Sequence, residues 1–250
     1  MNVALDKGHL QMYICSAIAK RITPMLSQLL NFFYPRSCIS CGNVLFSYEQ
    51  FFCLHCLYNL PETRYHEFAQ SPISQIFIGR ADIENAGAFL FYKKGNQVQK
   101  TLHHLKYKGI KEIGSFLGNI YGMQLIQHEK WKTIDLVIPI PLHQKKEKKR
   151  GYNQSEWIAK GLSAGMQIPY NTHLLIRSEF TETQTKKNRF HRWQNVKEVF
   201  QLTDLNALRN KHVLICDDVL TTGATLEAAI QKLMVVPFIK ISVVTLATAQ

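Results

Sequence analysis

The residues best suited to chemistry lie in one short segment, VLICDDVLTTGAT, at residues 213–225. Four apolar residues, 213–216, predict a buried strand, and two carboxylates, Asp217 and Asp218, follow at its carboxyl end. Open α/β sheets bind ligands at that edge. The turn into the next helix consists of Thr221, Thr222, Gly223, Ala224 and Thr225. The segment therefore predicts a ligand-binding loop between a strand and a helix.

This loop has the chemistry of a phosphate cradle. A helix N-terminus offers unpaired N–H groups and partial positive charge, and Gly223 lets the backbone approach a ligand closely. The carboxylates would repel a phosphate, so we interpret them as acceptors for the vicinal hydroxyls of a ribose whose 5′-phosphate fills the loop. The alternative, an ordinary N-capped helix, needs only one Thr. The GxxxxGK[ST] and GxGxxG patterns are absent, which argues against a Walker loop and a dinucleotide fingerprint.

Four cysteines occur as two CxxC pairs separated by eleven residues: Cys38, Cys41, Cys53 and Cys56. Each CxxC turn can aim two sulfurs at one ion, so the set predicts a tetrahedral zinc site. With all four ligands supplied by thiolates, the zinc would be structural. A disulfide or redox pair is the alternative. Zinc-binding cysteines suit a reducing compartment, and no secretion signal or membrane span is convincing, so we expect a cytoplasmic protein.

Two basic segments could contact an anion. The first, HQKKEKKRGYNQ at residues 143–154, is expected to form a loop after a strand at 134–142; it contributes Lys148, Lys149, Arg150, Asn153 and Gln154. The second, a polar loop at 177–195, contributes Gln184, Arg189, Arg192 and Asn195. Arg can grip a diphosphate bidentately, although a charge run is equally often a solvated face. The second loop could close over a ligand, and its Trp193 could stack on nucleic-acid bases or pack against the sheet.

The remaining pattern predicts the elements that position these residues. Strands are expected at 86–93, 134–142, 173–177, 197–202, 211–219 and 238–247, and helices at 97–127, 154–164 and 225–234. This alternation favours an α/β fold with a mostly parallel sheet flanked by helices. We expect residues 1–36 to form an amphipathic helical segment, 37–60 the zinc module, 61–85 a connector or hood, and 86–250 the α/β domain. The net charge of +12 suggests a polyanionic partner.

The segment at 213–225 resembles the phosphoribosyl pyrophosphate (PRPP) motif of type I phosphoribosyltransferases. The shared pattern is an apolar strand followed by Asp-Asp, two apolar residues and Thr-Thr-Gly-x-Thr. The resemblance implies that fold, ribose hydroxyls bound by Asp217 and Asp218, a 5′-phosphate in the Thr221–Thr225 loop, and magnesium accompanying PRPP. Further segments make the resemblance more specific: LKYKG at 105–109, IPIPLH at 138–143, RGYNQ at 150–154 and RSEFTETQ at 177–184. Together with the CxxC pairs, these segments resemble the ComF family, and they place Lys106 among the expected pyrophosphate or nucleic-acid contacts.

The ComF resemblance implies a role in natural transformation, through the uptake or handling of single-stranded DNA, with competence-machinery proteins as possible partners. The ligand would be PRPP or a ribose-5-phosphate-like molecule. Two alternatives remain: an active phosphoribosyltransferase that moves the phosphoribosyl group to an unidentified acceptor and releases pyrophosphate, and a nucleotide-pool sensor that uses the fold without turnover.

Overall fold

The computed structural model describes residues 35–177 and 199–249. They fall into two compact units, with the boundary between Tyr58 and Asn59. Residues 1–34 of the predicted amphipathic segment 1–36, and residues 178–195 of the second basic loop, lie outside the described residues. Within the described ranges, no helix has the length and hydropathy needed to cross a membrane.

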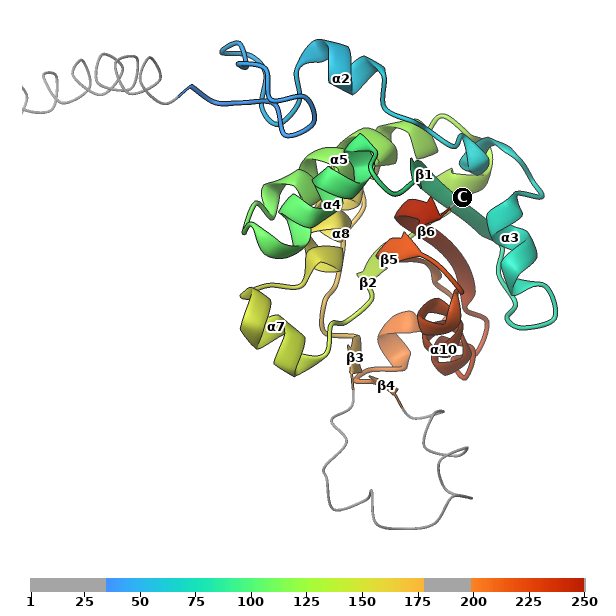
Figure 1. The fold of residues 1–250 in the computed structure, drawn as a ribbon. Coiled ribbons are helices and arrows are strands. Elements are labelled where there is room, and N and C mark those ends of the chain that lie inside the picture. The colour runs from blue at the N-terminus through green and yellow to red at the C-terminus, as the bar shows by residue number, and fades with distance from the viewer. Residues whose placement is uncertain (1–34, 178–198, 250) are drawn as a thin grey trace, which may run out of the picture. The chain divides into compact units, whose positions relative to one another are not determined.

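The second unit contains a parallel sheet of four strands in the order β1-β6-β5-β2 (Figure 1). The strands are β1 (Asn85–Tyr92), β2 (Leu136–Pro139), β5 (His212–Leu220) and β6 (Lys240–Ala249). The central pair is almost wholly buried, and its register joins Asp217 to Thr245 and Leu220 to Thr248. Continuous burial is typical of parallel strands covered on both faces, which confirms the expected α/β fold.

Helices cover the sheet on both faces, with α4, α5 and α8 grouped on one side and α10 on the other (Figure 1). Their bounds are α4 (Gln97–Tyr107), α5 (Glu112–Leu125), α8 (Gln154–Met166) and α10 (Ala224–Leu233); the short α6 (Glu129–Lys132) precedes β2. Helices α5 and α8 cross closely through facing glycines. A Cβ on Gly161 would lie 2.2 Å from the Ser115 carbonyl oxygen, and one on Gly118 would lie 2.5 Å from the Ile158 carbonyl oxygen. This crossing fixes the start of α8 beside the sheet.

Two expected elements differ in the structure. The single helix at 97–127 is two helices, because the chain turns at Gly109 with a φ of +74°. The expected basic loop contains a helix, α7 (Gln144–Arg150), because Lys, Glu, Gln and Arg have high helix propensity. The His143 side chain caps its first turn, and Gly151, at a φ of +85°, ends it.

The strand-like pieces at 173–177 and 197–202 pair with each other, as β3 (Leu175–Arg177) and β4 (Phe200–Leu202). They form an antiparallel hairpin outside the main sheet, so the main sheet has four strands in the described residues. Residues 178–198, which lie between the two strands in the sequence, are outside the described residues.

Residues 61–85, expected as a connector or hood, are packed as part of the α/β unit. The segment contains a 3-10 turn, η1 (Tyr65–Glu67), and a helix, α3 (Pro72–Phe77), that begins with a capping box at Ser71. Ile73 and Phe77 are buried in the core of this unit. Residues 62 and 63 bond along the edge strand β1, through a bridge from Glu62 to Leu90 and from the Thr63 amide to the Phe89 oxygen at 2.9 Å. The segment therefore covers one open edge of the sheet.

Candidate ribose-phosphate site and metal centre

The predicted phosphate loop lies between β5 and α10. Gly223 has a φ of +77°, which is favourable only for a residue without Cβ. A Cβ there would also lie 3.0 Å from Cγ2 of Ile76 in α3. The sequence places glycine here because the turn needs both the left-handed backbone and the space.

The loop surrounds a cavity of about 40 Å³ lined by residues 217 and 219–226. One water molecule needs about 10–15 Å³, so the cavity can hold a group the size of a phosphate. Among the described residues, none accepts a hydrogen bond from the amides of Thr222, Gly223 or Thr225, and the Ala224 amide makes one long bond of 3.4 Å to Oγ1 of Thr222. Free amides around a small cavity at a helix N-terminus are the physical requirement for an anion site.

The two carboxylates occupy distinct environments. Oδ1 of Asp217 accepts hydrogen bonds from the Ser155 hydroxyl and the Asp218 amide, both at 2.8 Å. Burial and then the charge of Asp218 raise the pKa of Asp217 to about 7, despite these bonds. Asp218 is 6% exposed, and its Oδ2 lies 2.9 Å from the Lys106 ammonium. Here a buried, partly protonated carboxyl group lies next to a carboxylate that is paired with a lysine. This arrangement is typical of a site that binds a hydroxyl group or a cation.

Lys106, expected as a pyrophosphate or nucleic-acid contact, pairs with Asp218 and so connects the acid pair to α4. The neighbouring Tyr107 is 69% exposed, and the Arg150 guanidinium lies 5.7 Å from its ring centre. The Tyr152 hydroxyl donates to the carbonyl of Leu105. Segments that are separated by more than forty residues in the sequence, LKYKG and RGYNQ, are thus in direct contact beside Asp218.

Two predicted contact residues have local structural partners. The Asn153 side chain caps α8 by accepting from the Ser155 amide, and its amide group donates to the Ile140 carbonyl at 3.0 Å. Gln154 is buried and accepts from Arg150. Arg150 therefore points along α8 toward Gln154, and both Asn153 and Gln154 hold the start of α8 in place.

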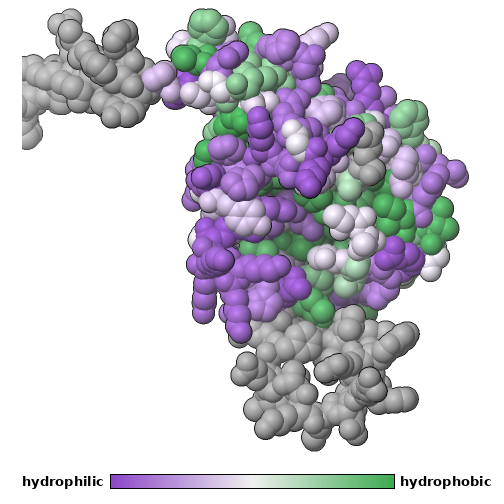
Figure 2. Space-filling model, viewed as in Figure 1, coloured by the Kyte–Doolittle hydropathy of each residue, from purple (hydrophilic) through white to green (hydrophobic). Residues whose placement is uncertain are grey.

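The lysines of α7 are exposed, and none of its residues is buried. A cavity of about 390 Å³ lies between α7 and the end of α4, lined by Lys106, Tyr107, Gly109, Lys146, Lys149 and Arg150. Figure 2 shows hydrophilic side chains gathered over α7, at the lower left of the view. Lys148 and Lys149 thus belong to a basic surface next to the acid pair, with Lys106 shared by both.

Three residues around the site were not predicted. Ser155 bonds to Asp217, and a hydroxyl in the first turn of α8 after the Asn153 cap was the only available hint. Burial lowers the pKa of Arg177, and the negative charge of Asp217 opposes this change. Arg80 donates to the Thr222 carbonyl at 3.2 Å and pairs with Glu227 of α10. Only the tertiary structure could reveal that Arg80 supports the loop.

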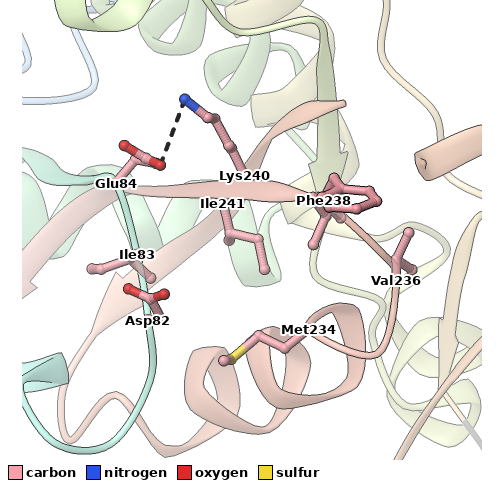
Figure 3. A pocket seen from close by; sticks show the side chains of 9 residues that line it. Asp82, Ile83, Glu84, Met234, Val236, Phe238, Lys240 and Ile241 are labelled. Atoms are coloured by element: carbon pink, nitrogen blue, oxygen red, sulfur yellow. Dashed lines mark ion pairs between the residues drawn. The ribbon is translucent and has the colours of Figure 1, made fainter. Parts of the chain in front are cut away.

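Four other predicted contacts lie outside the described residues: Gln184, Arg189, Arg192 and Asn195. Another cavity lies far from the acid pair. It has about 220 Å³, is open to solvent and lies at the amino end of β6, where Met234, Val236 and Phe238 face Asp82 and the Glu84–Lys240 ion pair, whose atoms are 3.9 Å apart (Figure 3). Ligand sites of parallel sheets lie at the opposite, carboxyl end, so this cavity is separate from the phosphate loop.

The first unit brings the four cysteines together. The four sulfurs all lie within 4.8 Å of one another, and those of Cys41 and Cys53 are 3.7 Å apart; the residues are Cys38, Cys41, Cys53 and Cys56. A tetrahedral ion with Zn–S bonds of about 2.3 Å requires sulfurs about 3.8 Å apart. The donor set therefore fits zinc.

Local structure explains how the two pairs converge. Gly42 turns the first pair at a φ of +83°, with its amide 2.8 Å from the Cys38 carbonyl. The second pair begins the short helix α2 (Leu54–Tyr58), whose first amide donates to buried Glu49 at 2.7 Å. Burial raises the pKa of Cys38, but backbone hydrogen bonds outweigh it and lower the pKa to about 7, whereas burial raises that of Cys56 to about 12. A bound zinc ion would stabilise the ionised form of all four thiols, so the thiols would release their protons when the ion binds.

Comparison with known proteins adds an independent finding. A profile of the phosphoribosyl transferase domain family matches residues 149–248. The chain is 29% identical over 136 residues to "DNA utilization protein YhgH" of Escherichia coli O157:H7, covering 53% of this chain and 59% of that protein. It is 28% identical over 193 residues to "Competence protein F" of Haemophilus influenzae, covering 76% and 75%. It is 30% identical over 143 residues to "Competence protein ComFC" of Bacillus subtilis, covering 57% and 56%. The chain thus spans less than two thirds of the YhgH proteins that it matches.

Proposed function

Because this chain is a ComF-family protein with a phosphoribosyltransferase-like domain, we propose that it binds PRPP or a related ribose phosphate and handles single-stranded DNA during DNA uptake. The observation that carries the proposal is the convergence at one sheet edge of free loop amides, the Asp217–Asp218 pair and Lys106. The names of the relatives support the connection to DNA uptake.

The ribose-phosphate part follows from charge and hydrogen-bonding capacity. The loop amides supply donors to a 5′-phosphate, and the acids supply acceptors to ribose hydroxyls. Lys106 and Arg150 provide positive charge on the α4 side of the acids, where a diphosphate on the ribose would be attracted. Asp217 and Asp218 offer hard oxygen ligands that would suit magnesium, and the ion would supply positive charge that offsets the charge of the diphosphate.

The DNA part depends on the basic surface of α4, α7 and α8. Exposed Tyr107 lies beside the 390 Å³ cavity, and half-buried Trp157 has the ammonium groups of Lys111 and Lys160 at 4.6 and 4.9 Å from its ring. Aromatic faces among basic side chains suit a flexible strand, since bases stack while phosphates contact the charges. Because Lys106 and Arg150 belong to both surfaces, we expect the two ligands to compete.

The decisive experiment titrates the full chain with PRPP plus magnesium and with a single-stranded oligonucleotide, each with and without the other, at two salt concentrations. We expect Asp218→Asn to weaken PRPP binding at least about tenfold. Asp82→Asn, at the opposite end of the sheet, is the control. Oligonucleotide affinity should fall steeply with salt. Wild-type protein that does not bind PRPP, or Asp218→Asn that binds it normally, would contradict the proposal.

A second candidate is catalysis, which the intact acid pair and loop favour. The protein would transfer the phosphoribosyl group to an acceptor and release pyrophosphate, with the loop, Lys106 and Arg150 stabilising charge that develops on the leaving diphosphate. This candidate predicts magnesium-dependent pyrophosphate release that Asp217→Ala or Asp218→Ala abolishes. Binding of PRPP without any pyrophosphate release would favour the binding function.

A cytoplasmic location and an association with proteins of the DNA-uptake machinery complete the proposal. The four-thiolate site supports a reducing compartment, because free thiolates are retained there. Fractionation of cells that express the chain, followed by detection in the soluble and membrane fractions, tests the location. Recovery of the protein mainly outside the cytoplasmic fraction would contradict it.

A further inference from the structure

A second group of metal-ligating side chains lies in the α/β unit, at the covered edge of the sheet. One ring nitrogen of His66, one ring nitrogen of His128 and a carboxylate oxygen of Glu67 all lie within 4.8 Å of one another. We propose that these three residues bind a transition-metal ion of the zinc class. The site is independent of the four cysteines and of the phosphate loop.

The first argument is the unpaired imidazole of His66. The residue is 3% exposed, and its Nδ1 is buried without a hydrogen-bond partner. None of the described residues bonds to either ring nitrogen of His66, whose backbone carbonyl accepts from the Trp131 indole at 3.0 Å. An unsatisfied buried polar group costs about 1–3 kcal/mol, and such groups call for an absent water or ion as partner. A coordinated cation would satisfy the imidazole.

The second argument is that the ligand is held rigidly. The His66 ring contacts the rings of both Tyr121 and His128, each at 5.4 Å between centroids. Its Cβ is packed against Gly87 of β1 so closely that a Cβ on this glycine would lie 3.2 Å from it and 2.6 Å from the Tyr121 hydroxyl. A fixed imidazole loses little conformational entropy on binding, which favours metal affinity.

The third argument is access. Glu67 is exposed and His128 is half-buried, so an ion can enter from solvent and retain a water as its fourth ligand. Glu67 has one weak competitor, Arg64, whose Nε lies 3.9 Å away in an exposed pair. Such a pair contributes about 0–1 kcal/mol, far less than coordination. Two imidazoles and one carboxylate select zinc, nickel or copper over magnesium and calcium.

Coordination would join two separate parts of the fold. His66 and Glu67 lie in η1 of the segment 61–85 that covers β1, and His128 is the N-cap residue of α6 after the turn from α5. The ion would therefore fasten the edge-covering segment to the helical layer. Binding to the folded state alone raises the midpoint of thermal unfolding, which provides a second readout besides metal content.

The test measures zinc per chain in untagged full-length protein equilibrated with buffered free zinc. We expect wild type to carry a second zinc ion beyond the one that the cysteines bind. Glu67→Gln and His128→Asn should each weaken this second site at least about tenfold. Glu67 is exposed, so its variant keeps the fold, and His103→Asn, at an exposed histidine of α4, is the matched control.

Cobalt substitution separates the two sites spectroscopically. The cysteine site gives thiolate-to-cobalt charge transfer, whereas the histidine site adds only d–d bands. Loss of those bands in both variants, with charge transfer and the His103→Asn spectrum unchanged, supports the proposal. Wild type without a second ion, or a second ion that both variants retain, would overturn it. Loss only in His128→Asn would remove Glu67 from the ligand set.

Discussion

The four-cysteine unit and the phosphate loop both bring polar groups together around one small volume, but they are stabilised in different ways. In residues 35–58 the buried apolar side chains, apart from the cysteines, are Leu45 and Phe52. The phosphate loop instead follows a strand whose residues 213–216 are fully buried in a four-stranded sheet. A unit with so few buried side chains depends on its ion, whereas a loop anchored in a sheet is preformed before its ligand arrives.

Zinc removal should give the largest difference between the two regions. Structural zinc contributes about 10–16 kcal/mol in small modules, more than two buried apolar side chains can replace. We expect Cys41→Ser, or a strong chelator, to abolish protection from hydrogen exchange in residues 36–58 while β5 and β6 remain protected. Exchange monitored by mass spectrometry measures both regions in one sample. Cys216→Ala, in β5, should keep the zinc; equal protection in all samples would refute the dependence.

Gly223→Ala tests whether the loop is as preformed as the sheet suggests. The left-handed φ costs about 1–2 kcal/mol for alanine, and the contact with Ile76 adds to it. We expect lower stability in urea and at least about tenfold weaker PRPP binding. Gly95→Ala is the matched control, since its φ is +87° but no atom lies within 4 Å of the added Cβ, and Gly95 lies outside the described cavities. Equal effects on PRPP binding would show that the loop geometry is irrelevant.

The buried Asp217 carboxyl should make the free energy of unfolding depend on pH, which apolar packing alone would not do. Its pKa is raised from 3.8 to about 7, so between these values the folded protein holds a proton that the unfolded chain has lost. Its contribution to stability is therefore present at about pH 4 and lost as pH rises toward about 7, by at most about 1.4 kcal/mol per pH unit. Asp217→Asn should lack this slope. Urea unfolding of both proteins, without magnesium or PRPP, measures it; parallel curves would contradict the raised pKa.

The smallest effect is expected on the basic surface, where no ligand geometry is preformed. Lys148→Ala should weaken oligonucleotide binding roughly two- to fivefold and reduce the slope of log affinity against log salt by about 0.7. Lys240→Ala, at the opposite end of the sheet, is the control. Fluorescence anisotropy at several salt concentrations measures both quantities. Identical slopes for Lys148→Ala and wild type would assign α7 to a merely solvated face.

Much of the fold was predictable because its signals are local. The apolar run before Asp217, the threonines after it and Gly223 specify a strand, a turn and a helix without help from distant residues. Paired CxxC turns specify the metal site in the same way. The break at Gly109 and the helix at 144–150 were missed, since a single glycine and a charge run are weak indicators of helix boundaries.

Residue types at short spacing already indicate which groups can bind an anion or a metal, because these are local properties of the chain. Which distant groups come into contact follows from the folded structure. It placed Lys106 against Asp218, Ser155 against Asp217, Arg80 beneath the loop, and His66 beside His128. Such meetings depend on how helices cross and how strands align, and these follow from packing over the whole unit, which no local pattern encodes.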